Sequence, residues 1–315
     1  MISMHHIITD TWSIGVLQRE MSVLYEAYCK GEPSPLPELA MQYADYASWQ
    51  REQLQGEFLH QGLAYWKGQL AGAPALLDLP ADHPRAAVQS YRGAQEVMKL
   101  RPELLERLQA LGRREGVTLF MVLLGAWQVL LSKYSGSEDV VVGSPIAGRN
   151  RREIEDLIGF FVNMLVLRTD LSGDPSFRQV LGRVREVALS GYEHQEVPFE
   201  KLVAELQPER SLSHSPLFQV AFQLQEAGDS TPGLSRLQMH SVSGVEPATA
   251  KFDLQLDFGA SSDGFAAVLV YSTDLFEQET IQRMLCHLER VLEQVSANAD
   301  VRISELELML SLIHI

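Results

Sequence analysis

Three stretches near the amino end place apolar residues at helical spacing among polar ones. In residues 14–28 the apolar positions recur between glutamine, arginine and glutamate with the period of a helix, which predicts a surface helix. Its buried stripe is expected to consist of Leu17, Leu24, Tyr25 and Tyr28. Gly31 and Pro33 should end this helix, because both residue types disfavour helical continuation.

A second helix is predicted over residues 41–50, which read MQYADYASWQ, and a third around residues 65–66. The second helix carries most of its aromatic rings on one side, namely Tyr43, Tyr46 and Trp49. Aromatic residues at helical spacing most often belong to a core. We therefore interpret them as core packing rather than as part of a substrate site.

Residues 77–90 contain Pro80 and Pro84 and show neither helical nor strand periodicity. This composition predicts an interdomain linker. It would separate residues 1–76 from a larger unit over residues 91–307, leaving residues 308–315 as a tail.

Strand and helix patterns alternate after residue 90, which indicates an α/β fold. The predicted helices span residues 102–115, 118–134, 176–193 and 277–297, and the second of these is almost wholly apolar and therefore buried. The predicted strands span residues 91–100, 140–142, 218–224, 252–258 and 265–271, with an SSDG turn at residues 261–264. Residues 143–149 should form a loop whose glycines allow a close backbone approach.

The composition describes a globular chain. It has 315 residues, of which 46% are hydrophobic and 21% charged, and a net charge of −15. An acidic chain does not provide the basic surface that binding to nucleic-acid phosphates requires. The basic run RNRR at residues 149–152 is followed at once by acidic residues, so we interpret it as a solvated turn and helix start.

The cysteines and the hydropathy suggest a location. Cys29 and Cys286 are too few for a disulfide framework, which fits a reducing cytosol. Neither a signal peptide nor an apolar run long enough to span a bilayer occurs in the sequence. We expect a soluble cytoplasmic protein that interacts with neither membranes nor nucleic acid.

Residues 4–13, MHHIITDTWS, hold the strongest chemical signal. His5 and His6 can exchange protons near neutral pH, and Asp10 supplies a carboxylate that could hold one of them or brace the loop. A histidine pair on a short loop is often incidental. A zinc site is disfavoured because no further histidine or cysteine lies close in the sequence.

This string resembles the active-site signature of condensation domains of non-ribosomal peptide synthetases, which belong to the chloramphenicol acetyltransferase-like superfamily. Further matches follow in the same order: MQYADYASWQ, then IGFFVN at residues 158–163 with the later Arg168, HQEVPFE at residues 194–200, and ERSLSHSPLF at residues 209–218. Three positions depart from the family's usual residues: Met164 replaces threonine, Glu196 replaces aspartate and Ser211 replaces aspartate. From the residues alone, Asn163 is an ordinary strand-end amide and His194 a helix-terminal histidine.

The resemblance implies a two-lobed α/β fold of mixed sheets with flanking helices, in which residues 1–76 are the remainder of an incomplete amino-terminal lobe. It implies amide bond formation between aminoacyl or peptidyl thioesters in the biosynthesis of peptide antibiotics and other secondary metabolites. The substrates arrive on phosphopantetheine arms of upstream and downstream peptidyl carrier proteins. An adenylation domain is expected in the same polypeptide, and no cofactor or metal is bound directly. The last residues differ from the polar helix expected there, which suggests a non-native tail.

The resemblance also suggests residue roles. His6 would be catalytic, His5 would pack inward and fix the loop, and Asp10 would hold an arginine, for which Arg149 is the visible candidate. The remaining candidates border the substrate tunnel: Thr11, Trp12, Ser13 and Asn163.

Thr11 is the main departure from the family, which usually has glycine at this place. Threonine adds bulk beside the reacting carbonyl and, being β-branched, disfavours a positive φ. Thr11 thus keeps open a non-catalytic carrier-docking or gating module of the same fold. An epimerising or ester-forming variant also stays open, because its diagnostic segment would lie upstream of these residues.

Overall fold

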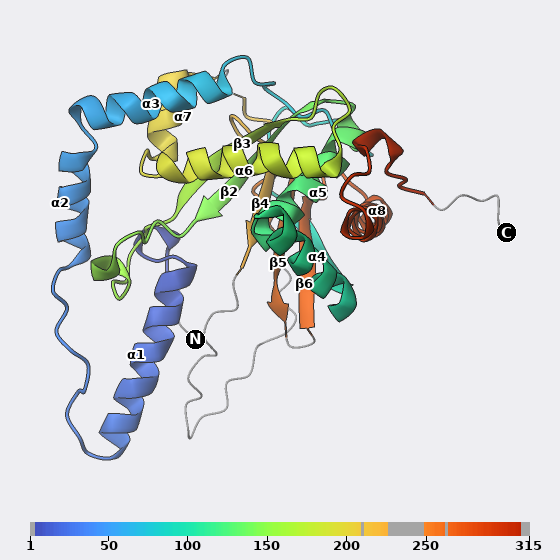
Figure 1. The fold of residues 1–315 in the computed structure, drawn as a ribbon. Helices are drawn as coiled ribbons and strands as arrows, with labels where there is room; N and C mark the ends of the chain where they lie inside the picture. Colours follow the sequence, from blue (N-terminus) through green and yellow to red (C-terminus); the bar gives the residue numbers. More distant parts are fainter. Residues whose placement is uncertain (1–3, 209–210, 226–248, 262–263, 310–315) are drawn as a thin grey trace.

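A single mixed sheet of six strands organises the computed structural model, which describes residues 4–208, 211–225, 249–261 and 264–309 (Figure 1). The spatial order is β1-β6-β5-β4-β2-β3. Strand β4 runs parallel to both of its neighbours, and all other pairs are antiparallel. The bounds are β1 Gly93–Leu100, β2 Asp139–Ile146, β3 Asn163–Asp170, β4 Val220–Leu224, β5 Leu254–Ser261 and β6 Gly264–Ser272.

Four helices pack together against this sheet: α4 Pro102–Glu115, α5 Leu119–Ser135, α6 Phe177–Glu193 and α8 Gln278–Ala297. Helix α5 lies in the middle of the core, and Trp127 near its centre is fully buried. Its ends follow from the sequence, because the Thr118 hydroxyl accepts the Met121 N–H and Gly136 ends the helix in the left-handed conformation. The almost wholly apolar sequence of residues 118–134 thus predicted a buried helix correctly.

Strand β2 is longer than predicted. Gly143, expected in a loop, lies inside the strand and pairs with Val166 and Ala221. A β-carbon on Gly143 would lie 2.1 Å from the Phe218 ring. The glycine therefore does permit a close approach, but the partner is a core aromatic ring.

The amino-terminal quarter adds three helices, α1 Thr11–Cys29, α2 Tyr43–Gln53 and α3 Gly56–Leu70. Helix α3 joins the core through Leu63, Trp66 and Leu70 and packs against α7, Phe199–Leu206. The predicted stripe of α1 is wrong in part, since Tyr25 and Tyr28 are exposed. The helix buries Ser13, Val16, Ser22 and Ala27 instead. At the start of the helix, the Ser13 hydroxyl bonds to the Gly159 backbone.

Residues 77–90 contain no helix or strand, yet they lie against the larger unit. Arg85 forms a two-pronged ion pair with the buried Asp253. Asp82 accepts hydrogen bonds from the Glu277 N–H at 2.8 Å and the Thr280 hydroxyl at 2.9 Å, at the start of α8. The domain boundaries themselves stay predictions. The SSDG turn falls partly, and the final six residues wholly, outside the described residues.

In the described part of the chain no single helix is long and apolar enough to cross a bilayer. Helices α4 and α5 are long and apolar enough only when taken together, and the chain bends by 103° between them. This statement rests on length and composition alone.

Exposed apolar side chains gather on α1, where Ile14, Met21, Tyr25 and Tyr28 share one stripe. Soluble monomers rarely expose a large contiguous apolar patch. We expect the isolated 315-residue chain to self-associate and to bind a hydrophobic dye. Light scattering should show less association for Ile14→Glu/Met21→Glu.

A matched control is Leu189→Glu, which changes an exposed leucine on α6, away from this stripe. Association that responds equally to both changes would contradict a specific role for α1.

Candidate active site

The histidine loop is a short 3-10 turn, His6–Ile8. The His6 Nδ1 lies 2.6 Å from the Thr9 carbonyl oxygen. Because a carbonyl oxygen only accepts, Nδ1 must carry the proton, and the neutral ring then leaves Nε2 with a free lone pair. The imidazole is exposed, and its ring meets Phe160 edge-on, with ring centroids 5.3 Å apart.

His5 uses its Nδ1 atom as a hydrogen-bond acceptor, whereas His6 uses the same atom as a donor. Its Nδ1 accepts the Ile7 N–H at 3.1 Å, so in a neutral His5 the proton lies on Nε2. The predicted inward packing of His5 is wrong, because the ring is exposed in the described structure and makes this local bond within its own turn. Neutral His6 therefore presents an unprotonated Nε2 and neutral His5 a protonated one.

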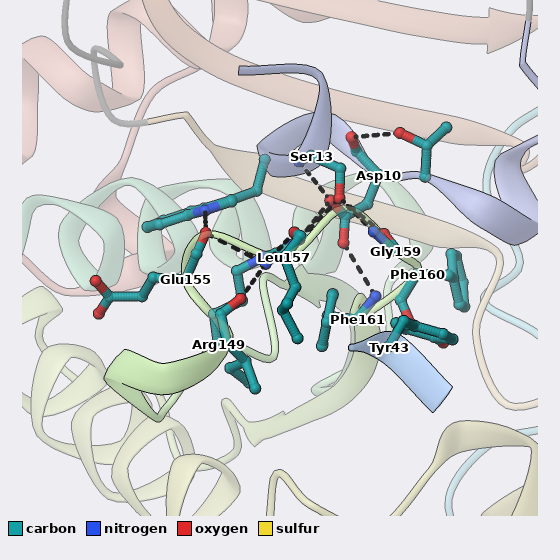
Figure 2. A network of polar contacts seen from close by, with 12 residues as sticks. Asp10, Ser13, Tyr43, Arg149, Glu155, Leu157, Gly159, Phe160 and Phe161 are labelled. Carbon is teal, nitrogen blue, oxygen red and sulfur yellow. Dashed lines mark hydrogen bonds and ion pairs between the residues drawn. The ribbon is translucent and has the colours of Figure 1, made fainter. Parts of the chain in front are cut away.

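Asp10 is a buried carboxylate at the start of α1 (Figure 2). Its Oδ1 accepts the Ser13 N–H at 2.7 Å as the helix cap, and its Oδ2 accepts the Phe161 N–H at 3.0 Å. The Arg149 guanidinium lies 3.4 Å from Oδ1. Burial alone would raise the pKa of the Asp10 carboxyl, but the hydrogen bonds from Ser13 and Phe161, aided by Arg149, hold it below its ordinary value.

Arg149 is equally buried, since its side chain and that of Asp10 are each 1% exposed. Its Nη1 donates to the carbonyl oxygens of Ile154 and Leu157, and its Nη2 donates to the Ser13 hydroxyl at 2.7 Å. Burial lowers the pKa of Arg149, and the Asp10 carboxylate opposes that shift. Every described hydrogen-bond acceptor of Arg149 is thus a carbonyl, a hydroxyl or the carboxylate.

The interpretation of residues 149–152 as a solvated turn is therefore wrong for Arg149. Its guanidinium lies 4.0 Å from the centre of the Phe161 ring, and that of Arg151 lies 4.2 Å from the Trp49 ring. Arg152 does begin a short 3-10 helix, as a helix start predicts.

The residues after Asp10 divide into buried and exposed groups. Ser13 is fully buried and uses its whole hydrogen-bonding capacity, donating to the Gly159 carbonyl at 2.8 Å and accepting from the Gly159 N–H at 3.0 Å and from Arg149. Contrary to the expected tunnel position, no part of Ser13 reaches the surface. Trp12 is exposed and donates its indole N–H to the Glu155 carbonyl at 2.8 Å.

Thr11 occupies the first position of α1, with an exposed side chain. It is not among the described non-glycine residues with positive φ. The expected backbone strain is therefore wrong, because a helical first turn suits threonine. The prediction that the Thr11 side chain adds bulk beside the histidine loop stays a prediction.

Asn163 ties the start of β3 to the segment between α6 and α7. Its amide nitrogen donates to the Gln195 and Val197 carbonyls, both at 2.8 Å. Its oxygen accepts from the Met164 and Phe199 N–H groups, at 2.9 and 3.0 Å. The side chain is thus committed to internal bonds, as the strand-end interpretation predicts.

Other motif side chains pack as expected. His194 ends α6, with Nδ1 2.8 Å from the Ser190 carbonyl and its ring stacked on Tyr65. Tyr43 and Tyr46 pack on Phe161, and Trp49 packs on Tyr46, in a small second core, as the packing interpretation predicts. The Glu209–Arg210 end of the ERSLSHSPLF motif lies outside the described residues.

Three contributors to the site were not predicted: the Thr9 carbonyl, the Gly159 backbone and the Phe160 ring. Two of them act through backbone atoms, for which side-chain identity gives no signal. Gly159 carried a weak sequence signal, because a glycine within an apolar segment can mark a close backbone approach. In the structure, a β-carbon at this position would lie 2.1 Å from the Tyr43 ring.

The described structure contains at least two cavities. One of about 280 Å³ adjoins Phe160 and is lined by α2 aromatics together with Glu196 and Glu200. Another, of about 430 Å³, lies on β1, β5 and β6, where burial raises the pKa of Asp257 to about 6. Among the described residues no group of three histidine, cysteine or acidic side chains is arranged to hold a metal ion.

Asp10→Asn should destabilise the protein by about 3–5 kcal/mol at pH 7, because it leaves the buried Arg149 without its counter-charge. The folded carboxyl has a lowered pKa, so its contribution is complete above the unfolded value of about 4 and is lost as the pH falls through the folded value. The difference between wild type and variant should therefore shrink on acidification below about pH 4. Urea unfolding at a series of pH values measures both effects.

Asp156→Asn is the matched control, since this aspartate pairs with Arg19 on the surface and such pairs contribute about 0–1 kcal/mol. An Asp10→Asn protein with wild-type stability and no activity would instead make Asp10 a catalytic group.

Comparison with known proteins places this geometry in a family. The family model described as "Condensation domain" matches residues 1–312. A linear gramicidin synthase protein of Brevibacillus parabrevis is 52% identical over 299 residues, which cover 95% of this chain and 4% of that protein. The chain thus spans a small part of that relative's length.

Two solved structures are similar throughout the chain. The X-domain from teicoplanin biosynthesis superposes with a TM-score of 0.88 at 31% identity, covering 97% of this chain and 70% of that one. A four-domain nonribosomal peptide synthetase bound to AMP and glycine gives 0.85 at 26% identity, covering 98% of this chain and 24% of that one. The predicted α/β fold with a mixed sheet and flanking helices is confirmed. The chain belongs to the condensation-domain family, and the relatives it matches are parts of non-ribosomal peptide synthetases.

Proposed function

We propose that this chain forms an amide bond between a donor acyl thioester and an acceptor amine in non-ribosomal peptide synthesis. The observation that carries the proposal is the 2.6 Å contact between His6 Nδ1 and the Thr9 carbonyl oxygen. This contact commits Nδ1 to the carbonyl, so the neutral ring directs an unprotonated Nε2 to the exposed side of the loop. Membership of the condensation-domain family supports the same reaction.

The reaction has two stages. The acceptor amine attacks the thioester carbonyl carbon, a C–N bond forms, and the carbonyl oxygen becomes an oxyanion. His6 Nε2 accepts or orients the proton that the attacking nitrogen loses. The C–S bond then breaks, the carbonyl re-forms, and the thiolate leaves and takes up a proton.

The other motif residues have supporting roles in this proposal. Asp10, Ser13 and Arg149 hold the histidine loop against residues 155–161 through buried bonds. Thr11 and Trp12 border the substrate path, because both are exposed directly after Asp10. Asn163 shapes the neighbouring wall through its internal bonds rather than by contacting substrate.

The substrates and partners follow from the family. Both acyl groups would arrive as thioesters on phosphopantetheine arms of upstream and downstream peptidyl carrier proteins, so no cofactor is bound directly. The similar four-domain synthetase was solved with AMP and glycine, which supports an adenylation domain in the same polypeptide. Two exposed free cysteines are compatible with the cytoplasmic location that we propose.

A second candidate is a non-catalytic docking module. Thr11 adds bulk at the first turn of α1, beside the histidine loop, and the teicoplanin X-domain has also been solved in complex with OxyB. Such a module would bind a partner protein without needing His6. The experiment below separates the two candidates.

His6→Ala in the full-length protein should reduce single-turnover amide formation on loaded carrier proteins by about 10²-fold or more, the usual scale for an acid–base group. His5→Asn is the matched comparison, because asparagine can still accept the Ile7 N–H. It should lose much less activity.

Near-normal transfer by His6→Ala would remove His6 from the chemistry. If the wild type itself transfers nothing while binding its partners, the docking module becomes the function.

A further inference from the structure

The Phe160 ring is in direct contact with the His6 imidazole. The two rings are nearly perpendicular, at 82°, with centroids 5.3 Å apart. Thr9 holds the Nδ1 atom of the same imidazole. The histidine ring is thus restrained by a hydrogen bond at one atom and by an aromatic contact.

The backbone on both sides of Phe160 is fastened at three consecutive residues. Ser13 binds the N–H and the carbonyl of Gly159, and Asp10 accepts the N–H of Phe161. The Phe160 carbonyl itself accepts the Tyr43 hydroxyl at 2.8 Å (Figure 2). Helix α1 therefore fixes the neighbours of Phe160, and helix α2 fixes Phe160 itself.

Tyr43 meets this segment through close packing as well as through its hydroxyl. A β-carbon on Gly159 would lie 2.1 Å from the Tyr43 ring, so the glycine is what lets the ring lie against the backbone. Burial raises the pKa of Tyr43, and its hydroxyl therefore remains a donor at neutral pH. Helix α2 thus meets this segment twice through Tyr43, with the ring against Gly159 and the hydroxyl on the Phe160 carbonyl.

We infer that Tyr43 and Phe160 are positioning residues for His6, through which α2 sets the orientation of the imidazole. This inference rests on the proposed function for its effect on rate, although the contacts themselves do not depend on it. Tyr43 acts on Phe160, and Phe160 acts on the histidine ring. Neither residue needs to touch substrate.

Tyr46 provides an internal comparison. It lies one turn further along α2 and packs on the Phe161 ring, with centroids 4.8 Å apart. Its hydroxyl accepts from Gln50 on the same helix at 3.2 Å and has no bond to Phe160. Removing the hydroxyl of Tyr43 or of Tyr46 should disturb α2 packing similarly. Only the loss of the Tyr43 hydroxyl removes the donor to the Phe160 carbonyl.

The test compares Tyr43→Phe, Phe160→Leu and Phe160→Tyr with the control Tyr46→Phe in the full-length protein. Tyr43→Phe and Phe160→Leu should lower kcat about tenfold with KM within about twofold, since small misplacements of a reacting group slow chemistry strongly. Phe160→Tyr should retain the rate because it keeps the ring. Tyr46→Phe should behave as wild type.

A second readout needs no catalytic activity. The rate at which diethyl pyrocarbonate modifies His6, followed by peptide mass spectrometry, reports how the imidazole is held. His6 should react severalfold faster in Phe160→Leu and Tyr43→Phe than in wild type and Tyr46→Phe. Unchanged melting temperatures identify the properly folded variants.

Equal loss of kcat in Tyr43→Phe and Tyr46→Phe would overturn the inference, because it would indicate a general effect on α2. Unchanged His6 reactivity in both Phe160→Leu and Tyr43→Phe would overturn it independently. Absence of amide formation in the wild type would sink the proposed function alone, and the modification rates would then decide the positioning role.

Discussion

The buried pair of Asp10 and Arg149 is the interaction on which the site depends. A buried ion pair rarely stabilises a protein more than apolar packing would, because both ions lose their hydration. This pair compensates through bonds to neutral groups: Asp10 caps α1 and binds Phe161, while Arg149 binds Ser13 and two carbonyls. Through these bonds, the pair fixes the histidine loop against a segment about 150 positions away in the sequence.

The connection between the histidine loop and this distant segment explains why the two adjacent histidines, when neutral, carry their protons on different ring nitrogens. Their turn is anchored at Asp10, so Thr9 presents its carbonyl to His6, and His5 can reach only the Ile7 N–H. Two residues of identical chemistry thereby offer the same ring nitrogen, Nε2, to solvent, unprotonated in neutral His6 and protonated in neutral His5. The choice between them as proton acceptor follows from local backbone geometry, and side-chain identity alone would leave it open.

Much of the fold could be predicted from sequence because local signals agreed with tertiary packing. Pro102 and Gly116 mark the ends of α4, and the alternation from Leu254 to Phe258 identifies β5. The site was predicted less completely, because the errors arose where backbone groups are the partners. Arg149 appears as a surface charge in its basic run, whereas bonds to the carbonyls of Ile154 and Leu157 help to satisfy its buried guanidinium, together with Ser13 and Asp10.

The glycine at position 159 shows how separate motifs become one site. It has no side chain to contribute, yet Ser13 binds both of its backbone groups and Tyr43 packs where its β-carbon would be. Helices α1 and α2 thus meet on one residue, and the next residue, Phe160, contacts His6. Three sequence motifs, separated by up to about 150 positions, therefore act together through two peptide units. Close backbone packing, rather than a larger set of catalytic side chains, is what this part of the fold contributes to the proposed reaction.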